Sequence, residues 1–145
     1  MINDIVDFSR IQHDEIRRLC HEVDAAGHDD KRRLFNELAE LVNVHEISDR
    51  EVVYPSVVDD TTGGAADAVA CLVEAGNILR DLSGMQRIES GDVTFDTHQF
   101  AALRRALVDH MAHEERAEFP RLRLYVPAQR LHAMASEAHD VQTMR

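Results

Sequence analysis

Two stretches of this chain are near-copies of each other, with the same kinds of side chain at the same spacing. Residues 45–55 read HEISDREVVYP, and residues 110–120 read HMAHEERAEFP. Each begins with a histidine, carries an acid four residues later, and ends in an aromatic residue followed by proline. In an α-helix, residues four apart lie on one face, so each imidazole and carboxylate can hold the same metal ion. Two such units on facing helices predict a helical bundle with a di-metal site inside it.

Hydrophobic periodicity predicts that the whole chain is helical. Amphipathic segments cover about residues 3–25, 29–58 and 65–83, a fourth begins at Asp96, and a short helix follows at about 127–140. A hydrophobic staple between Phe95 and Phe100 supports the predicted start of the fourth helix at Asp96. Gly27 and Gly84 are expected to end the first and third helices. Short connections favour antiparallel neighbours. We therefore expect one all-α domain over 1–145, an up-down-up-down four-helix bundle (core about 3–124) with a short extra C-terminal helix.

The predicted inner faces of the second and fourth helices both run into a histidine and an acid. Their residues are Leu34, Leu38, Leu41, His45, Asp49 and Val52, and Phe100, Leu103, Leu107, His110 and Glu114. This spacing is typical of a bundle core. A buried carboxylate must be paired or bound to metal, because burying it alone is costly. Arginines such as Arg50 and Arg105 fall off these faces, which favours metal cations as the partner.

Several other polar residues lie on or beside the predicted inner faces. They are His13, Glu46, Glu74, His113 and Glu115. His13 sits at the inner edge of the first helix, and Glu74 interrupts the inner pattern of the third. Glu46 and Glu115 are candidates for extra ligands or supporting acids, and His113 competes with the first histidine of its own repeat. Imidazoles and carboxylates without thiolates suit iron or manganese better than structural zinc.

Charge and cysteine content argue against several other functions. The net charge of −11 disfavours nucleic acid and anionic membrane surfaces as partners. No apolar run is long enough for a signal peptide or membrane span, which predicts a cytoplasmic protein. Cys20 and Cys71 fall in helical patterns and are expected to be reduced core residues. No second apolar face is visible in the pattern, which predicts a monomer.

Over roughly residues 9 to 124 the chain resembles the hemerythrin-like, or HHE cation-binding, domains of the bacterial single-domain type. The resemblance rests on the histidine of the first helix and on the two repeats that end in aromatic–proline. It implies a four-helix bundle holding two iron ions in an oxo- or carboxylate-bridged non-haem centre, and manganese shares such ligands. The ligands that it implies are His13, His45, Asp49, His110 and Glu114, with Asp49 and Glu114 bridging the ions.

The chain departs from the family pattern in ways that add carboxylates. Asp49 stands where glutamate is usual. Ala75 lies where the third helix most often has a histidine, so Glu74 is expected to replace that ligand. Glu46 fills a place that some members use as a ligand. Tyr54, at the aromatic position, is expected to pack in the core, with a phenolate ligand as the alternative.

This carboxylate-rich set bears on the expected activity. Anionic donors stabilise Fe(III) over Fe(II) and weaken reversible O2 binding, whereas the oxygen-carrying members have a histidine-rich site. The leading expectation is therefore catalase- or peroxidase-like turnover of hydrogen peroxide by the metals, without a separate catalytic nucleophile. A carrier or sensor of O2 or NO without turnover is the alternative. A metal-free helical interaction protein is the third hypothesis.

Overall fold

The chain folds almost entirely into helices. The computed structural model describes residues 3–86 and 95–144, and within these ranges every regular element is helical, as the sequence predicts. The elements are α1 Ile5–Ala25, α2 His28–Ser48, the π-helical η1 Asp49–Val53, α3 Tyr54–Asp59, α4 Ala65–Gln86, α5 Thr97–His113, the π-helical η2 Glu114–Glu118, α6 Phe119–Tyr125 and α7 Ala128–Thr143. None of the described helices has the length and apolar character that crossing a membrane requires.

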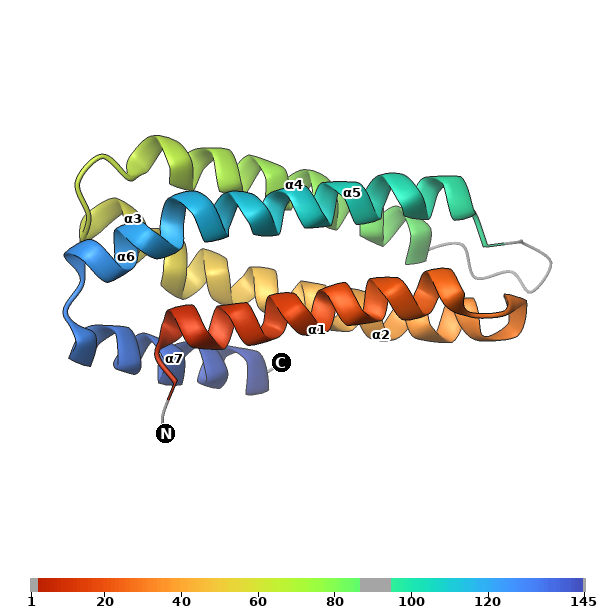
Figure 1. The fold of residues 1–145 in the computed structure, drawn as a ribbon, viewed down its shortest axis with the longest axis horizontal. Coiled ribbons are helices and arrows are strands. Elements are labelled where there is room, and N and C mark those ends of the chain that lie inside the picture. The colour runs from red at the N-terminus through yellow and green to blue at the C-terminus, as the bar shows by residue number, and fades with distance from the viewer. Residues whose placement is uncertain (1–2, 87–94, 145) are drawn as a thin grey trace.

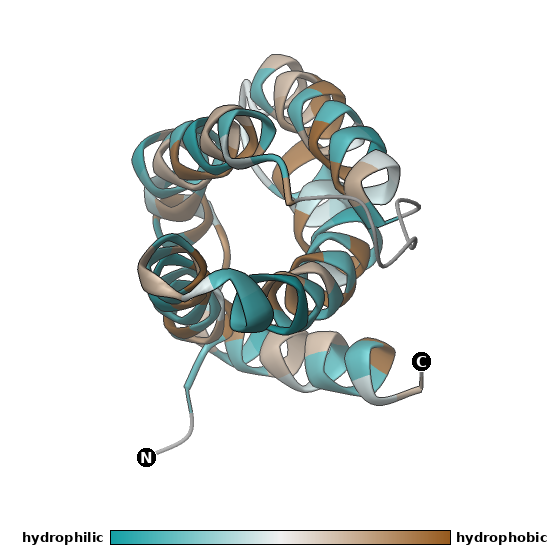
Figure 2. Ribbon diagram, turned by 90° about the vertical axis from the view of Figure 1, so that its right-hand side faces the viewer, coloured by the Kyte–Doolittle hydropathy of each residue, from teal (hydrophilic) through white to brown (hydrophobic). Residues whose placement is uncertain are grey.

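Long rods of helix surround a shared interior (Figure 1). α1 packs on α2, α2 on α4, and α4 on α5, which closes the ring against α1. α3 continues the line of α2, and α6 continues that of α5. Figure 2 looks along the rods and shows α7 outside the ring, where it packs on α1, α2 and η1. At 16 residues, α7 is longer than the short helix that was predicted.

Side-chain caps mark the starts of α1 and α5. The Asp4 carboxylate accepts a hydrogen bond from the Asp7 N–H at 2.9 Å, and the Asp7 carboxylate accepts one from the Asp4 N–H at 3.3 Å, which makes a capping box. The Asp96 carboxylate accepts from the Gln99 N–H at 2.9 Å. Such caps satisfy N–H groups that a helix start leaves without partners.

α1 ends at Ala25, as predicted, but the glycines predicted to stop the first and third helices do not do so. Gly27 does not adopt a left-handed conformation: its φ is −71°, and it serves as the N-cap of α2. The end of α1 is instead closed by Lys31, whose Nζ donates to the carbonyls of Val23 and Asp24 at 2.7 and 3.1 Å. Gly84 lies inside α4, which runs on to Gln86. The rest of the predicted loop after α4, residues 87–94, lies outside the described residues.

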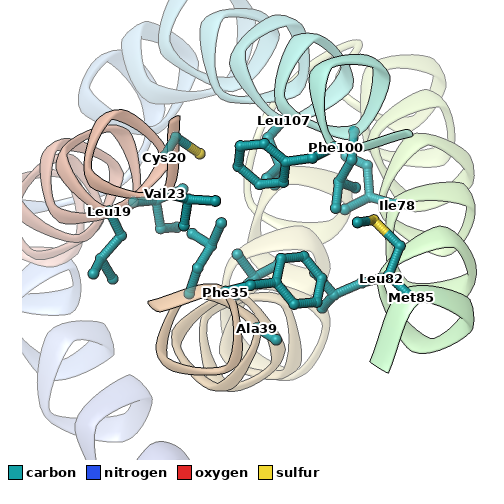
Figure 3. Close-up of a cluster of buried hydrophobic side chains, with 14 of the residues drawn as sticks. Leu19, Cys20, Val23, Phe35, Ala39, Ile78, Leu82, Met85, Phe100 and Leu107 are labelled. Atoms are coloured by element: carbon teal, nitrogen blue, oxygen red, sulfur yellow. The ribbon is translucent and has the colours of Figure 1, made fainter. Parts of the chain in front are cut away.

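Two apolar clusters fill the two ends of the shared interior. The first joins residues 16–23 of α1, 35–42 of α2, 78–85 of α4 and 100–111 of α5, together with Phe95 (Figure 3). There the rings of Phe35 and Phe100 meet edge to face, with centroids 6.0 Å apart. The second cluster includes Val53, Val57 and Phe119, and α7 packs against it. Between the two clusters, α1, the rod of α2 and η1, and the rod of α5 and η2 carry buried polar residues, so the middle of the interior is a polar layer.

The predicted inner faces are correct in part. In α2, Phe35 and Val42 are fully buried, whereas Leu34 and Leu41 are only partly so. On α4, Leu72 is 40% exposed and lies beside Val69 and Val73, which are 59% and 58% exposed. α4 therefore does present a second apolar face, and the reason given for a monomer does not hold.

Candidate metal centre

Both repeats make a π-turn directly after their histidine–acid pair. η1 begins at Asp49 and η2 at Glu114, and each ends just before the aromatic–proline pair. The aromatic N–H bonds to the carbonyl of that acid, five residues back. Proline has no N–H and its ring crowds the carbonyl four residues earlier, so a wider turn ahead of Pro55 and Pro120 relieves the clash. The π-turns were not predicted, although the matched aromatic–proline endings were a signal for them.

Six of the seven predicted ligands come together in the polar layer. They are His13, His45, Glu46, Asp49, His110 and Glu114, and none is more than 4% exposed. Ligand atoms of His13, His45 and Glu114 lie within 4.8 Å of one another, as do those of His45, Glu46, Asp49 and Glu114. His110 Nε2 lies 3.2 Å from Glu46 Oε1 and 3.5 Å from Glu114 Oε1. The overlap of these groups gives the layer the composition expected of a two-ion site.

Five atoms of this layer are buried without any hydrogen-bond partner. They are Nε2 of His13, Nε2 of His45, Oε2 of Glu46, Oδ2 of Asp49 and Oε1 of Glu114. Leaving a buried polar atom unpaired costs about 1–3 kcal/mol, and folded proteins almost always avoid it. Because all five are imidazole nitrogens or carboxylate oxygens, the donor set fits iron or manganese. Bound cations would satisfy all of them together.

The opposite nitrogen of each histidine in the layer is held by a hydrogen bond. Nδ1 of His13 contacts Glu115 Oε2 at 2.7 Å, Nδ1 of His45 contacts Gln12 Oε1 at 2.7 Å, and Nδ1 of His110 contacts Glu74 Oε1 at 2.8 Å. An imidazole that donates through Nδ1 keeps its lone pair on Nε2, and here all three Nε2 atoms face the layer. Proteins orient metal-binding histidines in this way.

Glu74 and Glu115 occupy supporting positions around this layer. Glu74 approaches the outer nitrogen of His110, and its side chain is 38% exposed. Glu115 holds His13 and is itself paired with Arg17 Nη2 at 2.9 Å. The structure thus places Glu74 behind a predicted ligand, and its role as a direct ligand stays a prediction.

The outer helix α7 reaches the layer through a chain of amides. Gln142 Nε2 donates to Gln12 Oε1 and to Ser48 Oγ, both at 2.9 Å, and Gln12 Nε2 donates to Gln142 Oε1 at 2.7 Å. Gln12 in turn accepts from His45. A residue near the C-terminus therefore helps to orient a candidate ligand, a role that the sequence did not predict.

Two further polar side chains lie next to the layer. Tyr54 is buried, as predicted, and its hydroxyl donates to Glu114 Oε2 at 3.2 Å and lies 3.4 Å from His110 Nε2. Glu118, one turn beyond Glu114, is completely buried, and neither of its oxygens has a hydrogen-bond partner. Sequence reasoning missed Glu118, although the four-residue spacing from His110 through Glu114 continues to it.

Burial and close packing shift the pKa values of the layer. Burial, with the Glu46 charge, raises the pKa of Asp49 to about 7, and burial with Asp49 raises the pKa of Glu114 to about 7. For His13 and His110, burial lowers the pKa, but their carboxylate partners outweigh it and raise the values to about 9 and about 10. Burial and His13 lower the pKa of His45 to about 4. Protons thus hold the metal-free layer together, and cations would have to displace them.

The helical ring and its buried imidazole–carboxylate layer define a helical protein built for cation binding. The chain matches the hemerythrin HHE cation-binding domain family over residues 4–122 of 145, and it belongs to that family. No curated protein and no solved structure matches it. Family membership and the donor groups of the layer agree in supporting a metal site.

Proposed function

We propose that the polar layer holds two iron ions and that the protein turns over hydrogen peroxide in a catalase- or peroxidase-like reaction. The observation that carries this proposal is the set of unpaired buried donor atoms, backed by three histidines anchored through Nδ1. The up-down-up-down order of the bundle belongs to the same proposal. Cytoplasmic location and a monomeric state stay predictions.

The six buried residues would divide the work of holding the metals. The three histidines supply nitrogen donors through Nε2, and the three acids supply oxygen donors. Glu114 lies within reach of both His13 and His110, at 3.4 and 3.5 Å, which suits it to bridge two ions. We assign Asp49 the second bridge, because its Oδ2 lies 3.2 Å from His45 Nε2 and shares a donor group with Glu114.

Peroxide disproportionation converts two H2O2 molecules to two H2O and one O2 by exchanging two electrons at a time. Two bound irons would supply that exchange, and the protein would set their charge and access. The carboxylate content of the layer favours this reaction over reversible binding of O2, because anionic donors stabilise the oxidised metal. Burial raises the pKa of Tyr54 well above its usual value, so the phenol stays protonated and keeps its hydrogen bond to Glu114.

A pocket between α4 and α5 offers small molecules a route towards the layer. It has a volume of about 230 Å³, and His110 and Glu74 line it together with Asp81 and Asp109. The two aspartates are exposed and make its outer part acidic. A neutral molecule such as hydrogen peroxide can enter such a pocket, whereas anions are disfavoured.

The test is metal content and oxygen evolution of the purified protein, measured together. We expect about two irons per chain and O2 release from added peroxide over many turnovers. His110→Ala should lose iron and activity, whereas His132→Ala, on the exposed face of α7, should keep both. Stoichiometric manganese would replace iron in the proposal. Iron that peroxide only bleaches, without O2 release, would favour an O2 or NO carrier or sensor. Absence of metal from a folded wild-type protein would leave a metal-free helical interaction protein.

A further inference from the structure

A second group of metal-binding side chains lies outside the polar layer, on the seam between α4 and α5. Cys71 Sγ lies 3.7 Å from His113 Nδ1, which lies 2.8 Å from Glu74 Oε2. Ligand atoms of Cys71, Glu74 and His110 fall within 4.8 Å of one another. Glu74 stands between the two histidines, with Oε1 towards His110 and Oε2 towards His113.

The spacing of these donors fits one small divalent cation. A tetrahedral zinc ion, with bonds of about 2.3 Å to sulfur and about 2.0 Å to nitrogen, places those two atoms about 3.5 Å apart. The distance from Cys71 to His113 is close to this value. The outer nitrogen of His113 lies 3.7 Å from Asp67 Oδ1, and Arg121 holds Asp67 at 3.1 Å. A carboxylate behind a histidine is the usual support of a zinc ligand.

The charge around the thiol favours a cation. Glu118 is fully buried, and its carboxylate and the Cys71 thiol are close enough to shift each other's pKa values. Burial raises the pKa of the Cys71 thiol far above its usual value, and the carboxylates of Glu118, Glu114 and Glu74 add to the shift. Negative charges that oppose a bare thiolate also attract a divalent cation, and the cation deprotonates the thiol on binding.

The cluster is also reachable from solvent. The side chains of Glu74 and His113 are 38% and 21% exposed, whereas Cys71 closes the inner side. The donors differ in kind from those of the polar layer, because a thiolate replaces one of the hard oxygen ligands. Soft and borderline cations prefer such a set.

We propose that Cys71, Glu74 and His113 form a separate mononuclear site for a zinc-class divalent cation. The site stands apart from the proposed iron centre, because neither Cys71 nor His113 is among the six buried donors of the polar layer. It borders that layer at His110, which Glu74 contacts and which has a ligand atom within 4.8 Å of Cys71 Sγ.

Cobalt(II) added to the purified protein tests this site directly, because cobalt bound to a thiolate absorbs in the near ultraviolet. The donors of the polar layer include no sulfur, so the band reports on the outer site whether or not iron is bound. We expect saturable absorption at one cobalt per chain, displaced by zinc. Cys71→Ser should abolish it, and His113→Ala should weaken cobalt binding by about tenfold or more.

Cys20→Ser is the matched control, because Cys20 is an equally buried thiol in the other apolar cluster. It should leave the cobalt band unchanged. A folded wild-type protein without a thiolate band, or a band that survives Cys71→Ser, would overturn the proposal. If Cys71→Ser does not fold, His113→Ala decides, since an unchanged cobalt affinity in that variant excludes the site. Iron content, measured on the same samples, shows separately whether the inner centre stands.

Discussion

At the scale of single residues, the arrangement of the three inner histidines is the most informative feature. Each imidazole is fixed through Nδ1 by a partner on another helix, and each turns Nε2 towards the layer. Nε2 of His13 and Nε2 of His45 have no hydrogen-bond partner, and Nε2 of His110 lies 3.4 Å from the Tyr54 hydroxyl. Three independent rings with this orientation are hard to explain by core packing. The partners differ, being one amide and two carboxylates, but each partner turns its ring so that Nε2 faces the layer.

Glu115 provides a residue-scale test of this support. The pKa of Glu115 is lowered to about 2, mainly by its hydrogen bond to His13 and to a smaller extent by its pairing with Arg17. Glu115 therefore stays ionised and holds the His13 ring in place. We expect Glu115→Ala to weaken iron binding by about tenfold, as loss of a supporting partner usually does. Competition with a chelator measures the change. Glu37→Ala, an exposed acid on α2, is the control and should bind iron like wild type. Equal iron affinity in the two variants would show that Glu115 does not position His13.

At the scale of elements, helical periodicity predicted where the long helices lie and which histidine–acid pairs face inward. It succeeded because a regular helix fixes which residues share a face. It does not show how deeply each apolar residue is buried: on α4, Leu72 is 40% exposed, whereas Cys71 and Ala75 are buried. The π-turns of η1 and η2 break the regular spacing, so helical periodicity does not fix which residues after them face inward. Glu118, the last residue of η2, keeps the four-residue spacing from His110 and Glu114 and was overlooked.

The role of α7 shows a different limit of sequence reasoning. Gln12 and Gln142 are 130 positions apart, and no local pattern indicates that their amides meet. Their contact depends on how α7 packs across α1 and α2, which only the folded chain determines. An extra helix outside the ring was therefore predicted, but its link to the polar layer was not.

Removing the amide of Gln142 tests that link. Gln142→Ala should release Gln12, loosen the orientation of His45 and weaken iron binding by about tenfold. Gln129→Ala is the matched control, because Gln129 lies on the exposed side of the same helix. Circular dichroism should show equal helix content in both variants. Iron affinity that is lowered equally in both, or in neither, would contradict a positioning role for α7.

At the scale of the whole molecule, the polar layer separates two apolar clusters that hold the helices together. Such a layer weakens the metal-free fold, because six ionisable side chains replace core packing there. The two clusters compensate at the ends of the interior. Stability of the whole chain should therefore depend on what neutralises the layer, protons or cations.

The sign of this dependence follows from the pKa shifts. The pKa values of His13 and His110 rise from 6.5 to about 9 and about 10 on folding. The folded chain therefore binds these protons more tightly than the unfolded chain does. The resulting stabilisation is complete below pH 6.5 and is lost as pH rises through 9 and 10. Asp49 and Glu114, raised to about 7, act in the same direction at lower pH, while His45, lowered to about 4, destabilises the fold only in acid.

We therefore expect metal-free protein to melt at a lower temperature at pH 10 than at pH 7, by about 5 °C or more. Iron-loaded protein should change much less over this range, because cations rather than protons neutralise its carboxylates. Calorimetry of chelator-treated and iron-loaded samples measures both. A drop of the same size in the two samples would mean that groups elsewhere on the chain cause it. A metal-free melting temperature that stays constant from pH 7 to 10 would show that protons do not hold this layer together.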